Sequence, residues 1–146
     1  MSDVRLNASR IVAAGVPDLD HATWTNGIRI GSELVLSGMT AHPATVTANQ
    51  PLSTYEQALI VLNKIKSLVE AEGGSIANIA RLTVYVTDIA DKDQITRARR
   101  VFFAGLGAYP TSTLVAVSGL VFPELTVEIE ASARLDFDLR QIRPPQ

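Results

Sequence analysis

The sequence predicts a single α+β domain in which two helices cover one face of a mixed β-sheet. Several segments alternate apolar and polar residues, as strands with one buried face do. Two longer segments repeat apolar residues three and four positions apart, as amphipathic helices do. No internal repeat, low-complexity tract or linker divides the 146 residues, so residues 1–146 are expected to form one domain. The expected order is β-β-β-α-β-α-β-β.

The N-terminal part supplies the first three predicted strands. Residues 1–10 are expected to be a loose terminus, followed by a short first strand at residues 11–14. Residues 28–30 and 34–37 flank Gly31-Ser32, a dipeptide typical of tight turns. This pattern predicts a β-hairpin.

The first helix is predicted over residues 54–72. Ser53 and Glu56 have the spacing of a capping box, in which the hydroxyl and the carboxylate each accept a free backbone N–H. Gly73-Gly74 follows as a left-handed stop. The apolar stripe of this helix is formed by Tyr55, Leu59, Ile60, Leu62, Ile65 and Val69.

The C-terminal half continues with a strand at residues 81–87, where Leu82, Val84 and Val86 alternate with polar residues and a tyrosine. A second helix is predicted from Lys92 to about Ala104, with Asp91 and Gln94 as a second capping box. The last elements are strands at residues 113–117 and 125–135 and a loose terminus at residues 140–146.

One face of this sheet is expected to lack a helical cover. Strands joined through helices lie parallel in one sheet, and both helices then pack on the same face. Leu114 and Ala116 are expected to share the open face with Glu128 and Glu130. Because a large exposed apolar surface usually marks an interface, the pattern favours a homo-oligomer.

Composition excludes several classes of function. The chain has 13 basic and 15 acidic residues and a net charge of −2, so it lacks the positive surface of a nucleic-acid-binding protein. No apolar run is long enough to span a membrane and no signal-peptide pattern opens the chain, so a cytoplasmic location is expected. The absence of cysteine removes thiol nucleophiles, disulfides and cysteine-based metal sites.

The strongest candidate for chemistry is the strand Val127-Glu128-Ile129-Glu130-Ala131. Its strict alternation places Glu128 and Glu130 together on the face opposite the three apolar residues. Such a pair is either part of a solvated face or the acidic wall of a site. A carboxylate without a metal or cofactor suits proton transfer and water activation.

The other candidates have simpler interpretations. His21 and His42 lie in loop-like segments without further ligands at metal-binding spacing, so no metal site is expected and both are interpreted as solvated. No phosphate-binding loop or nucleophile elbow is present, and no cofactor is expected. Arg97, Arg99 and Arg100 form a basic cluster on the second helix, interpreted as a solvated helix face.

Motifs spread over residues 12–136 occur in the order and at the spacing of a known family. They are Gly27–Gly31, Leu34–Gly38, Gln57–Leu59, Leu62–Lys66, Thr83–Asp88, Phe102–Phe103, Tyr109–Pro110 and Val127–Ala131. On these motifs the chain resembles the RidA/YjgF family of imine deaminases. The resemblance implies a chorismate-mutase-like fold and a homotrimer whose open sheet faces pack inward, with small-molecule pockets between subunits.

The resemblance also implies an activity and a set of site residues. Family members hydrolyse reactive enamines and imines, such as 2-aminoacrylate, to ketoacids and ammonia. Glu128 matches the glutamate that activates the attacking water, and Trp24 matches an aromatic residue that lines the pocket. Ser37 and Gly38 match the Ser-Gly that follows the third strand.

Three substrate-binding positions depart from the family pattern. Ser112 stands where the family has an arginine that grips the substrate carboxylate, and a hydroxyl cannot replace a planar cation. Thr96 replaces an asparagine, and Leu114 replaces a cysteine-like residue. These changes predict a less cationic pocket and weak or absent activity on 2-aminoacrylate, unless Arg97 reaches in from the second helix.

Three classes of function therefore stay open. The first is a hydrolytic deaminase that keeps Glu128 and acts on an imine or enamine without the usual carboxylate anchor. The second is a non-catalytic protein that binds a small molecule in the pocket between subunits. The third is a protein-interaction or RNA-directed role, which the acidic chain disfavours. Retention of Glu128 favours the first.

Overall fold

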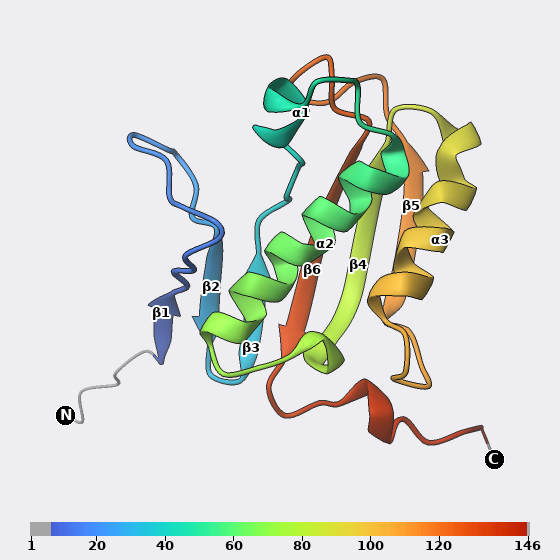
Figure 1. Ribbon diagram of the computed structural model, residues 1–146. Helices are drawn as coiled ribbons and strands as arrows, with labels where there is room; N and C mark the ends of the chain where they lie inside the picture. The colour runs from blue at the N-terminus through green and yellow to red at the C-terminus, as the bar shows by residue number, and fades with distance from the viewer. Residues whose placement is uncertain (1–6, 146) are drawn as a thin grey trace.

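A computed structural model describes residues 7–145 and has an α+β architecture built on a mixed six-stranded sheet (Figure 1). The order across the sheet is β1-β2-β3-β6-β4-β5. The strands are β1 (Ala8–Arg10), β2 (Gly27–Ile30), β3 (Glu33–Leu36), β4 (Ile79–Val86), β5 (Thr111–Ala116) and β6 (Val127–Arg134). The predicted fold class is confirmed.

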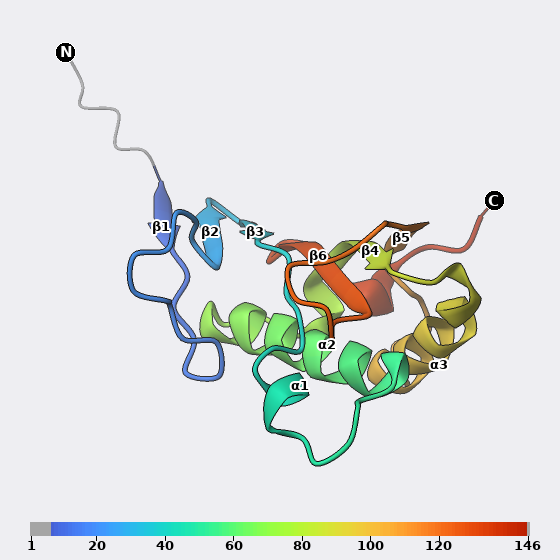
Figure 2. The ribbon, with the colours of Figure 1, turned by 90° about the horizontal axis from the view of Figure 1, so that it is seen from above.

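The two long helices, α2 (Thr54–Ala71) and α3 (Lys92–Phe102), lie on the same face of the sheet (Figure 2). The connection through α3 makes β4 and β5 parallel neighbours. The connection through α2 does not, because β6 inserts between β3 and β4 and pairs antiparallel with both. The last strand of the chain is therefore near the centre of the sheet.

Helix α2 begins as the sequence predicts. Ser53 Oγ accepts the Glu56 N–H at 3.1 Å, and the Glu56 carboxylate accepts the Ser53 N–H at 3.0 Å. Gly73, with a φ of +81°, ends the helix in the left-handed conformation that glycine adopts readily. The elements that the sequence did not predict are the short helix α1 (Ala44–Thr47) and the 3-10 helices η1 (Ile76–Asn78), η2 (Ile89–Asp91) and η3 (Leu139–Gln141).

The predicted second capping box, at the start of α3, is wrong. The Asp91 side chain does not cap the helix but accepts the Thr54 hydroxyl at 2.7 Å and the Gln94 amide at 3.2 Å. The Gln94 carbonyl in turn accepts the Tyr55 N–H at 3.0 Å. These side chains join the N-terminal ends of α2 and α3 instead of closing one helix.

The first strand and the termini also differ from prediction. Strand β1 lies at Ala8–Arg10 and not at residues 11–14, because its backbone pairs with β2, while Ile11 turns into the core. Part of the expected loose N-terminus is therefore sheet, and residues 1–6 lie outside the described residues. Near the C-terminus, Leu139 is buried within η3, so residues 139–141 are ordered against the domain.

The strand register decides which side chains face the helices. On β6, Val127, Ile129, Ala131 and Ala133 are buried beneath the helices, whereas Glu128 and Glu130 lie on the open face. Glu128 is opposite Tyr85 and Glu130 is opposite Thr83.

The expected places of Leu114 and Ala116 are wrong. Strand β5 pairs them with the buried residues Val84 and Val86, so they belong to the helix-covered face. Their neighbour Val115 lies on the open face, together with Ile28, Ile30 and Val35 of β2 and β3. That face thus does expose apolar side chains, though not the ones expected.

No helix in the described part of the chain is long and apolar enough to span a membrane.

Candidate active site

Four of the predicted site residues line one cavity of about 710 Å³: Trp24, Ser37, Gly38 and Glu128. This volume lies within the range of small-molecule pockets. The residues come from the loop before β2, the end of β3 and the start of β6. The cavity is therefore built where the chain leaves β3 and passes beside β6.

A backbone bridge positions Gly38 beside Glu128. The Met39 N–H donates to the Ile129 carbonyl at 2.8 Å, and the Ile129 N–H donates to the Met39 carbonyl at 3.1 Å. A Cβ atom placed on Gly38 would overlap the Glu128 carboxylate. Glycine at this position is thus required by the close approach of the glutamate to the backbone.

Glu128 and Glu130 have different environments although they share a face. The Tyr85 hydroxyl donates to Glu130 Oε1 at 2.7 Å. Within residues 7–145, no side chain or backbone N–H donates a hydrogen bond to the Glu128 carboxylate, which lines the cavity instead. Burial, together with the negative charge of Glu130, raises the pKa of Glu128 above its ordinary value. Glu128 is therefore the better placed of the two as a base.

The wall around Glu128 is largely apolar. Leu19, Met39, Val121 and Phe122 contribute to it. Trp24, the predicted aromatic residue, also lines the cavity but keeps 55% of its surface exposed. The Ser37 hydroxyl donates to the Thr25 carbonyl, so it holds the preceding loop and only its lone pairs are available to a ligand.

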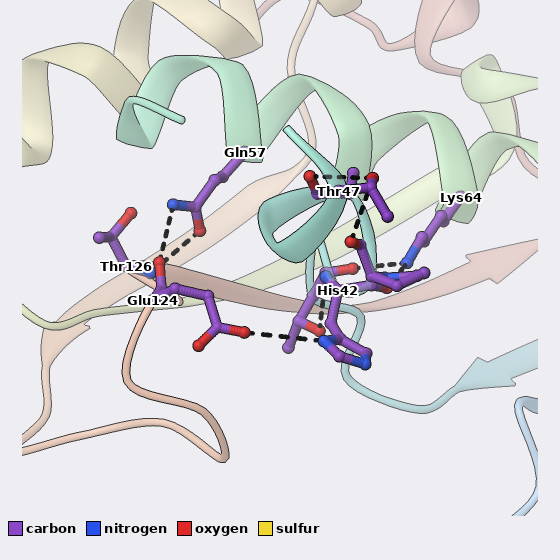
Figure 3. A network of polar contacts seen from close by, with 9 residues as sticks. His42, Thr47, Gln57, Lys64, Glu124 and Thr126 are labelled. Carbon is purple, nitrogen blue, oxygen red and sulfur yellow. Dashed lines mark hydrogen bonds and ion pairs between the residues drawn. The ribbon is translucent and has the colours of Figure 1, made fainter. Parts of the chain in front are cut away.

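Polar side chains border the cavity on the side of helix α2. Lys64 Nζ donates to the carbonyls of Thr40 and His42, at 2.7 and 2.8 Å, and burial lowers the pKa of Lys64. Figure 3 shows Lys64 and Gln57 projecting from the same helix toward His42 and Glu124. His42 Nδ1 lies 3.7 Å from Glu124 Oε1.

His42 and Lys64 were not among the residues expected at the site. His42 is half-buried rather than solvated, and its ring packs on Phe122 with the centroids 4.4 Å apart. Both residues line the cavity. No pattern indicated the place of His42, because the segment around it has no periodicity that would orient its side chains.

The other predicted polar residues line a second cavity, of about 320 Å³, at the edge of the sheet. It is formed by Thr96, Arg99, Arg100, Tyr109, Pro110 and Ser112. Arg99 Nη1 donates to Ser112 Oγ at 2.6 Å, and Arg99 Nη2 donates to Thr96 Oγ1 at 3.4 Å. A guanidinium from helix α3 therefore contacts the hydroxyl that stands at the position of the family's arginine.

The arginine that reaches Ser112 is not the one expected. Arg97 lies over the ring of Tyr55, 4.2 Å from its centroid, and so points elsewhere. Arg99 follows the buried Ile95 by one helical turn, which places it on the flank of the apolar stripe and explains its partial burial. The spacing of Arg99 from Ile95 was the feature of the sequence that could have identified this arginine. Leu114 lines neither cavity and packs against the hydrophobic core.

A single chain does not bring Glu128 and Ser112 together. Glu128 lies on the open face opposite Tyr85, whereas Ser112 is paired with the buried Leu82 on the helix-covered face at the outer strand. Each lines a different cavity. If both belong to one site, a second copy must supply one of them.

Comparison with known proteins identifies a family that this chain matches. The profile of the family described as Endoribonuclease L-PSP matches residues 19–135. TdcF of Escherichia coli, named a putative reactive intermediate deaminase, is 32% identical over 111 residues, which cover 75% of this chain and 84% of that protein. The 2-iminobutanoate/2-iminopropanoate deaminase of the same organism is 30% identical over 112 residues, covering 75% and 85% respectively.

Solved structures agree with the fold. The crystal structure of PA3499 from Pseudomonas aeruginosa, described as a protein of unknown function, superposes with a TM-score of 0.92 at 57% identity and covers 94% of this chain and 99% of that chain. The crystal structure of E. coli TdcF with bound serine superposes with a TM-score of 0.75 at 29% identity, covering 86% and 98%.

Proposed function

Because this chain belongs to the Endoribonuclease L-PSP family, which includes the RidA/YjgF deaminases, we propose that it hydrolyses a small imine or enamine with Glu128 as the base. The observation that carries this proposal is the Glu128 carboxylate: it borders an apolar cavity, receives no hydrogen bond from residues 7–145 and has a raised pKa. A general base works best when its pKa lies near the working pH.

The reaction needs only water and a proton carrier. Glu128 accepts a proton from a water molecule as the water oxygen bonds to the imine carbon, and it returns this proton to the nitrogen to give a carbinolamine. Glu128 then carries the hydroxyl proton of the carbinolamine to the nitrogen as the C–N bond breaks, so that ammonia leaves and the carbonyl forms. In sum, an imine and one water yield a carbonyl compound and ammonia, and the Glu128 carboxylate is regenerated.

The walls of the cavity favour a substrate with an apolar side chain. Met39, Val121 and Phe122 offer no partner for a charged group, whereas they can bury an aliphatic or aromatic one. One relative with this fold, TdcF, holds serine in its crystal structure, which supports a ligand of amino-acid size.

A homotrimer with sites between its subunits is part of the proposal. The open face of the sheet exposes Ile28, Val35 and Val115, which a second copy can cover. The separation of Glu128 from Ser112 in one chain supports the same arrangement, because a neighbouring subunit can supply the missing wall.

Hydrolysis of imines released by an amino-acid oxidase tests the proposal. The protein competes with semicarbazide, which traps free imine, and ammonia release is followed for the imines of alanine, leucine and phenylalanine. We expect wild type to lower semicarbazone formation and Glu128→Gln to lose about 10²- to 10⁴-fold in kcat. Glu130→Gln is the matched control, since it changes the neighbouring carboxylate, and should retain most activity.

Equal rates for wild type and Glu128→Gln would show that Glu128 is not the base. If wild type accelerates none of these reactions but binds the corresponding ketoacids, the chain is a binding protein for such compounds and not a deaminase of amino-acid-derived imines.

A further inference from the structure

Among the arginines of residues 7–145, Arg99 is unusual because it is half-buried without a carboxylate partner. Arg10, Arg29, Arg134 and Arg140 each form an ion pair with an aspartate or glutamate. Within residues 7–145, Arg99 has no such pair, and its side-chain hydrogen bonds go to neutral hydroxyls. A buried charge without a counter-charge is costly unless something else compensates it.

The two hydroxyls orient the guanidinium without neutralising it. Ser112 and Thr96 each accept one N–H, and a guanidinium has more donors than these two contacts use. The remaining donors belong to a side chain that lines the cavity of about 320 Å³. A planar group with free N–H donors matches the two oxygens of a carboxylate.

The surroundings strengthen the attraction for an anion. Arg100 lines the same cavity and adds a second positive charge, and Tyr109 and Pro110 complete its wall. Burial lowers the pKa of Arg99, because the cation is partly removed from water.

We propose that Arg99, oriented by Ser112, binds the carboxylate of the imine or enamine substrate. The inference rests on the proposed function and reverses one expectation drawn from Ser112: carboxylate-bearing imines become substrates of this chain. The serine then acts as a positioning residue, and the cation comes from helix α3 instead of strand β5.

A purely structural role for Arg99 predicts something different. If the contact with Ser112 only joined α3 to β5, its loss would change thermal stability but would not change the preference of the site for charged over neutral ligands. Ligand selectivity therefore separates the two roles, and stability does not.

Calorimetric titration of the intact protein with 2-oxobutanoate and with its neutral amide, 2-oxobutanamide, tests the proposal. Wild type should bind the carboxylate more tightly than the amide. Arg99→Gln should weaken binding of the carboxylate by about ten- to hundredfold, the loss of a charge-assisted contact, and leave the amide unaffected. Arg99→Lys should restore part of the preference, and Arg97→Gln, the matched control on the same helix, should keep all of it.

The inference is overturned if wild type does not distinguish the two ligands, or if Arg99→Gln distinguishes them as well as wild type does. Imine hydrolysis with an unchanged kcat/KM in Arg99→Gln would reject the anion site and leave the proposed function standing. An Arg99-dependent preference in a protein that hydrolyses no imine would reject the function and keep the anion site.

Discussion

Glu128 and Glu130 are two residues apart on one strand, yet only one of them is free to act on a ligand. The Tyr85 hydroxyl occupies Glu130, and the hydrogen bond together with nearby negative charge raises the pKa of that tyrosine. Glu128 has the cavity in front of it and the Gly38 backbone beside it. The division of roles between two like side chains is thus set by their neighbours.

The pH dependence of activity should report the environment of Glu128. A base must be ionised to work, so a raised pKa places the acidic limb of kcat/KM at higher pH than an ordinary glutamate would. Glu130→Gln removes one of the two causes of the shift, so the limb should move to lower pH. Initial rates of wild type and of Glu130→Gln, measured between about pH 4 and 9, give the position of the acidic limb for each protein.

Stability supplies the control for that prediction. A carboxylate whose pKa is raised by folding favours the folded state below its unfolded pKa, and this contribution is lost as the pH rises through the folded pKa. Glu128→Gln should therefore melt at the same temperature as wild type or higher at neutral pH. A lower melting temperature, or an acidic limb that Glu130→Gln does not move, would contradict the electrostatic interpretation.

At this scale the resemblance of motifs predicted four residues that meet, but it did not predict the contact of Ser112. Trp24, Ser37, Gly38 and Glu128 do line one cavity. Arg99 was not foreseen, because its contact with Ser112 joins a helix to a strand. Such a contact depends on how helix and sheet pack, which no spacing along one segment contains.

Among the elements, helix α2 holds the far wall of the cavity through a buried glutamine. Gln57 donates to the carbonyls of Leu52 and Glu124, at 3.1 and 3.2 Å, and accepts the Thr126 N–H at 3.0 Å. Figure 3 shows this side chain reaching from the helix to the segment before β6. The same segment carries Val121 and Phe122 into the cavity.

Gln57→Leu should lower the free energy of unfolding by about 2–4 kcal/mol, since it leaves buried backbone groups without partners. Urea unfolding followed by circular dichroism measures the change. Because the substitution also frees the segment that carries Phe122, ligand binding should weaken.

Asn63→Leu is the control for that experiment, as an exposed residue of the same helix, and should change stability by less than about 0.5 kcal/mol. A Gln57→Leu variant as stable as the control would mean that the three hydrogen bonds contribute nothing net.

Elements with strong local signals were predictable, and those decided by distant partners were not. The capping box of α2 needs only Ser53 and Glu56, and it forms. The capping box predicted for α3 does not form, because the Asp91 carboxylate accepts the hydroxyl of Thr54, which is distant in the sequence. Strand β1 was placed three residues late, since its position is decided by pairing with β2 and not by its own pattern.

For the whole molecule, the main question is which subunit supplies which half of the site. If Glu128 and Arg99 act across an interface, two impaired variants should complement one another. Glu128→Gln and Arg99→Gln chains, co-expressed in equal amounts, should regain about one quarter of the wild-type kcat/KM for a carboxylate-bearing imine. Each interface draws its two chains independently, so that fraction of sites receives both intact residues.

Light scattering should give the mixed assembly three times the mass of one chain. Co-expression of Glu128→Gln with the double variant Glu128→Gln/Arg99→Gln is the control and should stay inactive, because no chain then carries the glutamate. Mixed trimers without recovered activity would show that both residues act within one subunit.

The contact between Arg99 and Ser112 also bears on how such a protein can change over generations. With a serine at position 112 this edge of the sheet still has a positive charge, because the Arg99 guanidinium on helix α3 lies 2.6 Å from the Ser112 hydroxyl. A chain with arginine at both positions would keep a cation at this edge after losing either one. An alignment compares only the residue at the strand position, whereas the fold shows that a positive charge lies beside it.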